Sequence, residues 1–226
     1  MTYTIIKDRS AFESFVAWLP EIDENEAYYL TLLARKKYHE SALSDKSALK
    51  RFVATSKSYL VQKVNQLELP KGLYLNKAGN PIHEEALALY ISVNPRDLKL
   101  AQKTLLKRLV DVALDPTNLQ NPAALALSEI QKSKSRGVFV DFDFDINDVE
   151  IPQTAEKIKS IIGKDAVKFL RTRGGFHALV TPKIAAQNGP KKWHQEISSL
   201  AGCDVVGDSL IPVPGSYQGG FTPYFF

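Results

Sequence analysis

The sequence predicts a protein of the α+β class. Two observations support this class: short runs that alternate apolar and polar residues, as strands do, and longer runs whose apolar residues recur at helical spacing. Hydrophobic residues make up 44% of the 226-residue chain, which is enough for a sizeable buried core. No apolar run is long enough to span a bilayer, so we expect a cytoplasmic protein without a membrane partner.

The charge and the cysteine content narrow the class of partner and site. The net charge of +4 is compatible with a polyanionic partner but does not require one. The single cysteine, Cys203, excludes a disulfide framework and a cysteine-rich zinc site. We therefore do not expect Cys203 or His39 to be a metal ligand.

Residues 1–130 are expected to form an N-terminal lobe of mixed helices and strands. Ser44 is the expected N-cap of an amphipathic helix that Pro70 and Gly72 follow. The expected elements are a strand at 27–38, a helix at 45–67, a strand at 86–93, a helix at 97–114, a loop at 115–122 and a helix near 123–133.

Residues 131–226 are expected to form a second lobe, in which the order of helices and strands differs from that of the first lobe. We expect strands at 137–146, 166–172, 176–182 and 209–216, with helices at 153–162 and 190–201. This strand–helix–strand–strand–helix–strand order is ferredoxin-like and is shared by RNA-recognition modules. The boundary between the lobes is expected near 115–135, and the two lobes can also form one composite domain.

The stretch "SRGVFVDFDFDINDVE" (135–150) places three aspartates at alternate positions of a predicted strand. Val138, Val140, Phe142, Phe144 and Ile146 would form its apolar face, and Phe139, Asp141, Asp143 and Asp145 would lie on the other. Residues on one face of a strand are about 6–7 Å apart, so neighbouring carboxylates can share a cation or a close pair of cations. Asp141 and Asp143 are therefore candidate metal ligands.

This stretch has two other interpretations, a calcium-binding loop and a strand that runs out into solvent. An EF-hand loop needs glycine at its sixth position and glutamate at its twelfth, where this chain has Ile146 and Pro152, so that interpretation is rejected. A strand that runs out into a polar turn would account for Asp145, Asn147 and Asp148. It does not account for Asp141 and Asp143, because buried acids without partners are rare.

Two further stretches carry candidate site residues. In "FLRTRGGFHALV" (169–180), a turn at Gly174 and Gly175 tolerates positive φ and close backbone approach, and its N–H groups can bind phosphate oxygens. Arg171 and Arg173 can add donors to such a site, and His177 follows, although a single histidine of this kind is more often structural. The stretch "GCDVVGDSLIPVPGSYQGGFTPYF" (202–225) offers Asp204 or Asp208, then a Pro-Gly-Ser turn and a glycine pair.

In this order, the three stretches resemble the motifs of the archaeo-eukaryotic primase superfamily, the primase–polymerase (PrimPol) group. That family carries an hhhDhD strand, a hairpin with GGxH and a later hydrophobic-Asp motif, often followed by a Pro-Gly-Thr/Ser turn. Here they are "VFVDFD" (138–143), "TRGGFH" (172–177) and "CD" (203–204) with "VPGS" (213–216). The resemblance covers about 136–225, with a looser match at "LYISVNPR" (89–96).

The resemblance implies a site and a reaction. Asp141, Asp143 and Asp204 would hold two Mg²⁺ or Mn²⁺ ions. His177 would contact the phosphates of a nucleoside triphosphate, helped by Gly174 and Gly175. Thr172, Arg171 and Arg173 would lie in the same nucleotide-binding turn. We favour Asp204 over Asp208, because its distance to "VPGS" fits the family pattern better.

The sequence thus predicts a metal-dependent, template-directed nucleotidyltransferase, a primase or DNA or RNA polymerase that acts on nucleoside triphosphates. Arg35, Lys36, Lys37 and Tyr38 are the candidates for contact with a DNA or RNA template. A helicase or another replication partner would be encoded separately. The alternatives are a metal-dependent nuclease with the same acids, and a non-catalytic nucleic-acid-binding module with an RNA-recognition-like sheet.

Overall fold

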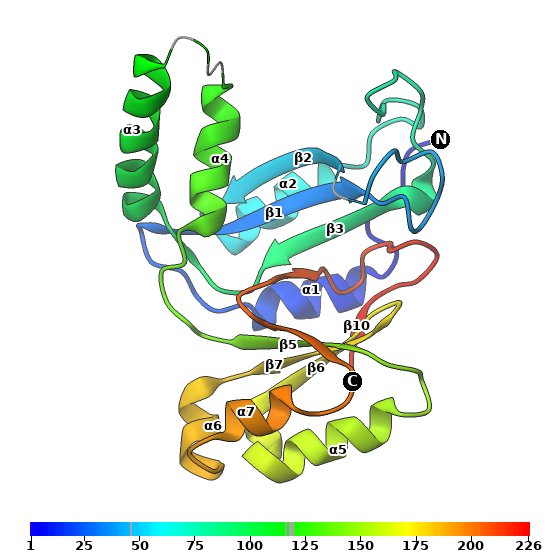
Figure 1. Ribbon diagram of the computed structural model, residues 1–226. Coiled ribbons are helices and arrows are strands. Elements are labelled where there is room, and N and C mark those ends of the chain that lie inside the picture. The colour runs from blue at the N-terminus through cyan, green and yellow to red at the C-terminus, as the bar shows by residue number, and fades with distance from the viewer. Residues whose placement is uncertain (46, 116, 118–119) are drawn as a thin grey trace.

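The computed structural model describes residues 1–45, 47–115, 117 and 120–226. In this part of the chain, two antiparallel sheets combine with seven α-helices (Figure 1). The predicted α+β class is therefore confirmed. None of the helices in the described ranges has the length and the apolar character that crossing a membrane requires.

The first sheet has the strand order β2-β1-β3-β9, and the short β4 pairs with the start of β1. Alternate residues of β1, such as Leu30 and Leu32, are fully buried in the main core with α1 and α2. The expected strand at 86–93 is confirmed as β3, and the one at 27–38 is confirmed as β1 up to Ala34, after which residues 36–38 form a turn. The bounds are α1 Arg9–Trp18, β1 Glu26–Ala34, β2 Ser47–Ala54, α2 Lys57–Asn65, β3 Leu87–Ser92, β4 Arg96–Asp97 and β9 Leu210–Pro212.

The second sheet has the strand order β10-β6-β7-β5-β8. Helices α5, α6 and α7 cover one face of it (Figure 1), and Phe142 and Phe144 of β5 point into this second core. The bounds are β5 Val140–Asp145, α5 Ile151–Ile162, β6 Val167–Arg171, β7 Gly175–Val180, α6 Pro182–Asn188, α7 Trp193–Ser198, β8 Cys203–Gly207 and β10 Tyr224–Phe225.

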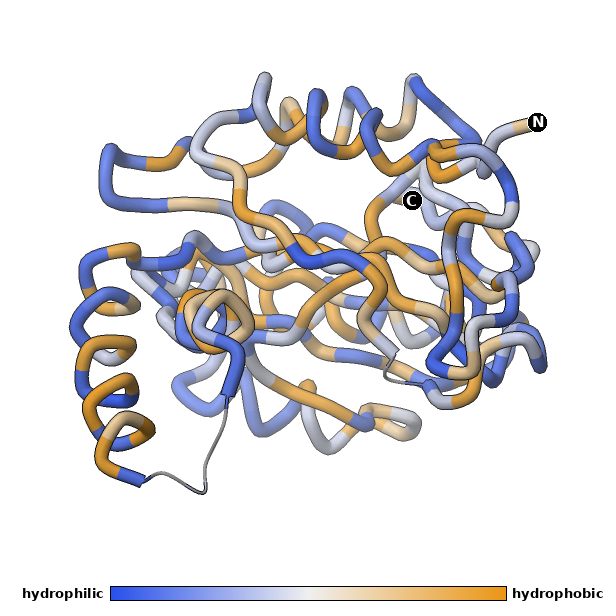
Figure 2. Tube along the Cα trace, turned by 90° about the horizontal axis from the view of Figure 1, so that it is seen from above, coloured by the Kyte–Doolittle hydropathy of each residue, from blue (hydrophilic) through white to orange (hydrophobic). Residues whose placement is uncertain are grey.

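Helix α1 lies between the two sheets (Figure 1). Its Phe12 and Phe15 belong to one core cluster with Leu170 and Leu179 from the second sheet. The tube in Figure 2 shows the same layers from above, with hydrophobic segments gathered in the middle of the molecule. The proposed boundary near residue 131 stays a prediction, and the main core draws residues from both sides of it.

Two helices, α3 (Leu98–Leu114) and α4 (Pro122–Lys132), form a hairpin that stands away from the sheets (Figure 1). The side chain of Asp97 caps α3 by accepting a hydrogen bond from the Leu100 N–H, and Asn121 caps α4 in the same way. Both helices were predicted from the sequence. Residues 116, 118 and 119 of the predicted loop lie outside the described residues.

The prediction of one helix over residues 45–67 is wrong in its first half. Residues 47–54 form β2, which pairs with β1 in a register that sets Leu30 opposite Phe52. The helix begins only after Ser56, whose hydroxyl accepts a hydrogen bond from the Tyr59 N–H. Leu49 and Phe52 have a helical spacing, but hydrogen bonding to a distant strand overrides this local pattern. Residue 46 lies outside the described residues.

Three further elements differ from the prediction: the first helix, the helical segment after β7 and the strand predicted at 209–216. Helix α1 was not predicted. Residues 182–198 form two helices, α6 and α7, instead of one helix at 190–201, with Gly189 and Pro190 between them. The final strand, predicted at 209–216, is shorter and pairs with β3 of the first sheet, so β8 is the strand that follows α7 in the second sheet.

Candidate functional site

Strand β5 presents its three aspartates on one face, as the alternation predicts. Phe142 and Phe144 fill the core on the helix-covered face, whereas Asp141, Asp143 and Asp145 lie on the opposite face. Burial decreases along this row, from the buried Asp141 through the half-buried Asp143 to the exposed Asp145. Each carboxylate is therefore in a different environment.

Asp141 is held by His177. Strand β7 runs antiparallel to β5 with His177 opposite Asp143. The Nδ1–H of His177 donates to the carboxylate of Asp141, with distances of 2.9 Å to Oδ1 and 3.1 Å to Oδ2. The Nε2 atom of His177 lies 3.6 Å from Oδ1 of Asp143. Burial lowers the pKa of His177, but the carboxylates of Asp141 and Asp143 outweigh it, so the pKa is raised.

The carboxylate of Asp143 lies near the other acids of the site. Burial raises the pKa of Asp143 the most, His177 opposes this, and the charges of Asp141, Asp204 and Asp145 raise the pKa further. A site that disfavours its own negative charge in this way gains from a bound cation. Oxygen donors close together are the ligands that Mg²⁺ and Mn²⁺ prefer.

A β-bulge brings Asp204 to the same face. In the pairing of β5 with β8, Asp143 lies opposite Val205 and Phe144 opposite Cys203, so Asp204 is the extra residue. A bulge turns the side chain of the extra residue away from strict alternation. As a result, Asp204 and Asp143 line one pocket, which has a volume of about 290 Å³.

Asp208 has a different environment. Its Oδ2 atom forms an ion pair with Nη1 of Arg96 at 2.5 Å, and its Oδ1 atom accepts from Nδ2 of Asn94 at 2.7 Å. The Oδ1 atom of Asn94 also accepts from the N–H groups of Val138 and Phe139, just before β5. Asp208 thus belongs to a structural network that joins the two sheets. It is not one of the described residues that line the pocket of Asp143.

The glycine pair of the hairpin is required by space. A Cβ atom on Gly175 would lie 1.9 Å from the carbonyl oxygen of Phe144, whereas Gly174 has only Asp145 Oδ1 nearby, at 3.7 Å. Neither glycine has a positive φ, so the expected left-handed turn is not what selects glycine here. Close approach of β7 to β5 explains Gly175.

Gly175→Ala is therefore expected to lower the free energy of unfolding by about 2 kcal/mol or more, because Cβ would clash with the backbone of β5. Urea unfolding followed by circular dichroism measures this change. Gly174→Ala is the matched control, and its effect should stay within about 0.5 kcal/mol. Equal stability of the two variants would contradict the assignment of Gly175 to a close backbone contact.

The arginines of the hairpin have separate roles. Nη1 of Arg171 donates to the carbonyl oxygens of Thr172 and Gly175, and Nη2 forms an ion pair with Asp148. Arg171 therefore stabilises the hairpin. It is not one of the described residues that line the pocket of Asp143. Arg173, predicted in the nucleotide-binding turn, is also not among the described residues that line this pocket; its Cζ atom lies 4.9 Å from the centre of the Tyr38 ring. The buried Thr172 lines the pocket.

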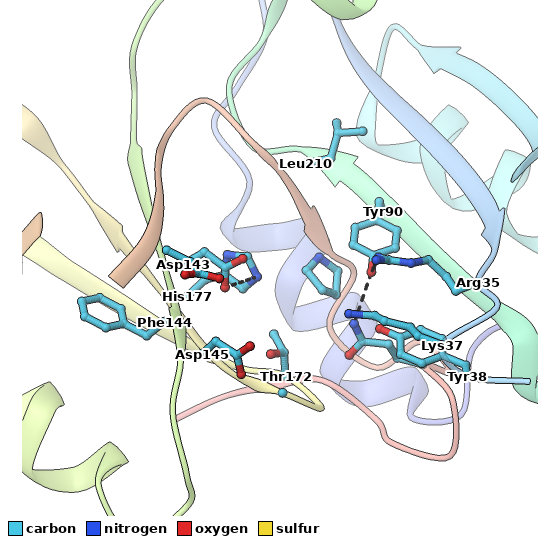
Figure 3. A pocket seen from close by; sticks show the side chains of 14 residues that line it. Arg35, Lys37, Tyr38, Tyr90, Asp143, Phe144, Asp145, Thr172, His177 and Leu210 are labelled. Atoms are coloured by element: carbon cyan, nitrogen blue, oxygen red, sulfur yellow. Dashed lines mark hydrogen bonds and ion pairs between the residues drawn. The ribbon is translucent and has the colours of Figure 1, made fainter. Parts of the chain in front are cut away.

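A basic wall faces the aspartates across the pocket (Figure 3). Arg35 and Lys37 follow the end of β1, and Nη1 of Arg35 donates to the Tyr90 hydroxyl at 2.5 Å. The Nζ atom of Lys37 lies 5.3 Å from the centre of the Tyr38 ring. Within the described ranges, Arg35, Lys37 and Arg173 have no carboxylate partner, and Nε of Arg35 is buried without a hydrogen bond. These cations are free to bind an anion.

The acidic and the basic wall enclose one pocket of about 290 Å³. Tyr90 lies in the loosely matching stretch "LYISVNPR" (89–96) and Gln218 follows "VPGS" (213–216), but the sequence assigned neither residue a role in the site. Lys36, which was predicted to contact the template together with its neighbours, is exposed. It is not one of the described residues that line this pocket. The lining residues are Arg35, Lys37, Tyr38, Tyr90, Asp143, Phe144, Asp145, Thr172, Gly174, His177, Asp204, Leu210, Pro212 and Gln218.

The fit to a divalent cation differs among the three predicted ligands. Asp143 and Asp204 face the pocket, whereas both oxygens of the buried Asp141 accept from His177 and Asp141 does not line the pocket. Among the described residues, no three or more His, Cys, Asp or Glu side chains are grouped so as to hold a metal ion. The donor chemistry fits a hard cation. A carboxylate has about four lone-pair sites, so Asp141 can keep its hydrogen bond to His177 and still bind a cation that reaches it.

Comparison with known protein families, with curated proteins and with solved structures finds no significant match to this chain. The assignment of a function therefore rests on the motifs and on the geometry of the pocket.

Proposed function

We propose that the chain is a metal-dependent, template-directed nucleotidyltransferase of the primase–polymerase type. The observation that carries the proposal is a pocket in which Asp143 and Asp204 face Arg35 and Lys37, two cations without a carboxylate partner among the described residues. Metal ions bound to carboxylates and basic groups bound to phosphates are the two requirements for catalysis of phosphoryl transfer from a nucleoside triphosphate.

The order of strands in the second sheet supports this proposal. Strands β5, β6, β7 and β8 are joined in the order βαββαβ and lie in the sheet as β6-β7-β5-β8. This order is the one expected of a ferredoxin-like module, in which the first and third strands of the motif are central, and we take it as support for the proposal. Those two strands carry Asp141, Asp143 and His177, as the family resemblance requires.

In the proposed site, Asp143 and Asp204 hold Mg²⁺ or Mn²⁺, and Asp141 completes the set or keeps His177 oriented. Two divalent ions, when bound, would activate a 3′-hydroxyl and stabilise the departing pyrophosphate. Arg35 and Lys37 bind the triphosphate from the opposite wall, and His177 contacts it from β7. This arrangement reassigns Arg35, Lys37 and Tyr38 from the template to the nucleotide.

The alternative of a non-catalytic RNA-recognition-like module has less support. Such modules stack bases on exposed aromatic residues of the open sheet face. Here that face carries Asp141, Asp143 and His177, and its Leu170 and Leu179 are buried in the core that includes α1. Little open sheet is left for base stacking.

The direct test is incubation of the protein with labelled ribo- or deoxyribonucleoside triphosphates, Mn²⁺ or Mg²⁺, and a primed or unprimed template. We expect metal-dependent incorporation with release of pyrophosphate. Shortening of the nucleic acid without incorporation would replace the proposal by a nuclease. Binding of nucleic acid without either reaction would replace it by a non-catalytic module.

Arg35→Ala is expected to raise the KM for the nucleoside triphosphate by about ten-fold or more, because a charged donor to phosphate is lost. Steady-state incorporation kinetics measure the KM, and fluorescence anisotropy measures template affinity. Lys36→Ala is the matched control, since Lys36 is adjacent and exposed. If Arg35→Ala weakened only the template, Arg35 would return to the originally predicted role.

His177→Ala is expected to weaken triphosphate binding more than template binding, because it removes a donor at the nucleotide and frees the carboxylate of Asp141. Isothermal titration with a non-hydrolysable triphosphate, compared with template binding, tests this. Equal loss of both affinities, together with a lower melting temperature, would indicate that His177 only stabilises the fold.

A further inference from the structure

The outer face of α3 exposes an unusual number of apolar side chains. Leu106, Val110 and Leu114 are 66%, 50% and 79% exposed and recur every four residues, so they form one row along the helix. Leu100 is exposed as well. The only fully buried residue of this 17-residue helix is Ala101. Most globular helices bury their apolar row, so this row indicates a contact surface.

A row of lysines borders the apolar row. Lys99, Lys103 and Lys107 are exposed and also recur every four residues. Lys103 precedes Leu106 by three residues and Lys107 precedes Val110 by three, which makes the two rows neighbours on the helix. In the described part of the chain, none of the three lysines has an ion pair. The combined face is about 22 Å long.

The inner face of α3 is occupied by α4. Nη1 of Arg108 forms an ion pair with Oε1 of Glu129 at 2.7 Å, and Glu129 is buried between the helices. No described element covers the outer face, whose leucines and valine are exposed, and the hairpin stands at the edge of the molecule (Figure 1). In Figure 2, hydrophobic and hydrophilic segments alternate along α3 at this edge.

We infer that this face of α3 docks an acidic amphipathic helix of a partner protein. Apolar side chains of such a helix would cover Leu106, Val110 and Leu114, and its glutamates or aspartates would pair with the three lysines. A second copy of this chain fits less well, because two such faces would oppose lysine rows. Duplex nucleic acid would pair with the lysines but would leave the leucines in water.

The test uses a labelled helical peptide with leucines on one face and glutamates on both sides of that face, and fluorescence anisotropy of its binding to the whole protein. Two triple variants remove each part of the surface: Lys99→Glu with Lys103→Glu and Lys107→Glu, and Leu106→Gln with Val110→Gln and Leu114→Gln. The matched control places the same charge change at Lys183, Lys191 and Lys192 in the other lobe. All nine side chains are exposed, so melting temperatures should remain close to that of the wild type.

We expect the wild type and the control to bind the peptide, and both α3 variants to lose at least about ten-fold in affinity. A peptide with lysines in place of the glutamates should bind only to the charge-reversed variant. Absence of peptide binding, or equal binding by all variants, would overturn the inference. So would sedimentation of the wild type as a dimer that the leucine variant dissociates, or α3-dependent binding of anionic vesicles or duplex DNA in place of the peptide. This outcome does not depend on the proposed catalytic activity.

Discussion

Asp143→Asn is expected to abolish metal-dependent nucleotide incorporation without loss of stability. The carboxylate lies between Asp141, Asp145 and Asp204, and its loss removes the central ligand of the proposed metal site. The same change removes a negative charge that the folded protein disfavours. Without metal, the melting temperature at neutral pH should therefore be equal to that of the wild type or higher.

The pH dependence of this stability difference has a defined sign. Because the pKa of Asp143 is raised in the folded protein, the wild type gains stability relative to the variant as the pH falls through that pKa. The advantage of Asp143→Asn should thus shrink on acidification in the presence of a chelator.

Asp145→Asn is the control for this change. It should be milder, because Asp145 is exposed at the end of β5. Full incorporation by Asp143→Asn would exclude the metal site. Asp141→Ala is expected to abolish incorporation as well, either directly or through the orientation of His177.

Asp204→Asn and Asp208→Asn are expected to have opposite effects. Asp204 lines the pocket with Asp143, so Asp204→Asn should abolish incorporation and leave stability nearly unchanged. Asp208 instead neutralises Arg96, whose side chain is only 3% exposed. Asp208→Asn should retain most of the activity but lower the free energy of unfolding by about 2–3 kcal/mol, because it leaves a buried charge without its partner.

Incorporation assays and urea unfolding of the two variants test this pair of expectations. The reverse pattern, an inactive Asp208 variant and an active Asp204 variant, would move the third carboxylate to Asp208. It would also show that the motif is placed four residues too early in the chain.

The contrast between the two aspartates shows how far local pattern determines a site. The alternation in "VFVDFDFD" (138–145) is sufficient to place Asp141, Asp143 and Asp145 on one face, because strand geometry is set by the backbone. The sequence also favoured Asp204 by its motif. The reason that Asp204 faces the pocket is a bulge in the pairing with β5, and pairing between distant strands leaves no local signal.

The same limit explains the elements that were predicted wrongly. Helices α3 and α5 were predicted because their apolar spacing and the prolines near their N-termini are local features. Residues 47–54 have apolar spacings compatible with a helix, and only hydrogen bonding to β1 makes them a strand. Residues 210–212 form a strand as expected, but their partner is β3 of the other sheet.

Patterns of neighbouring residues are sufficient to predict the α+β class, the aspartate row and the order of the motifs. The bond between His177 and Asp141, and the position of Arg35 and Lys37 across one pocket from the aspartates, depend on tertiary packing. These contacts join residues that are distant in sequence, and packing of the two sheets around α1 brings them together. The aspartates thus share one face because of local strand geometry, whereas Arg35 and Lys37 lie opposite them because of the way the sheets pack.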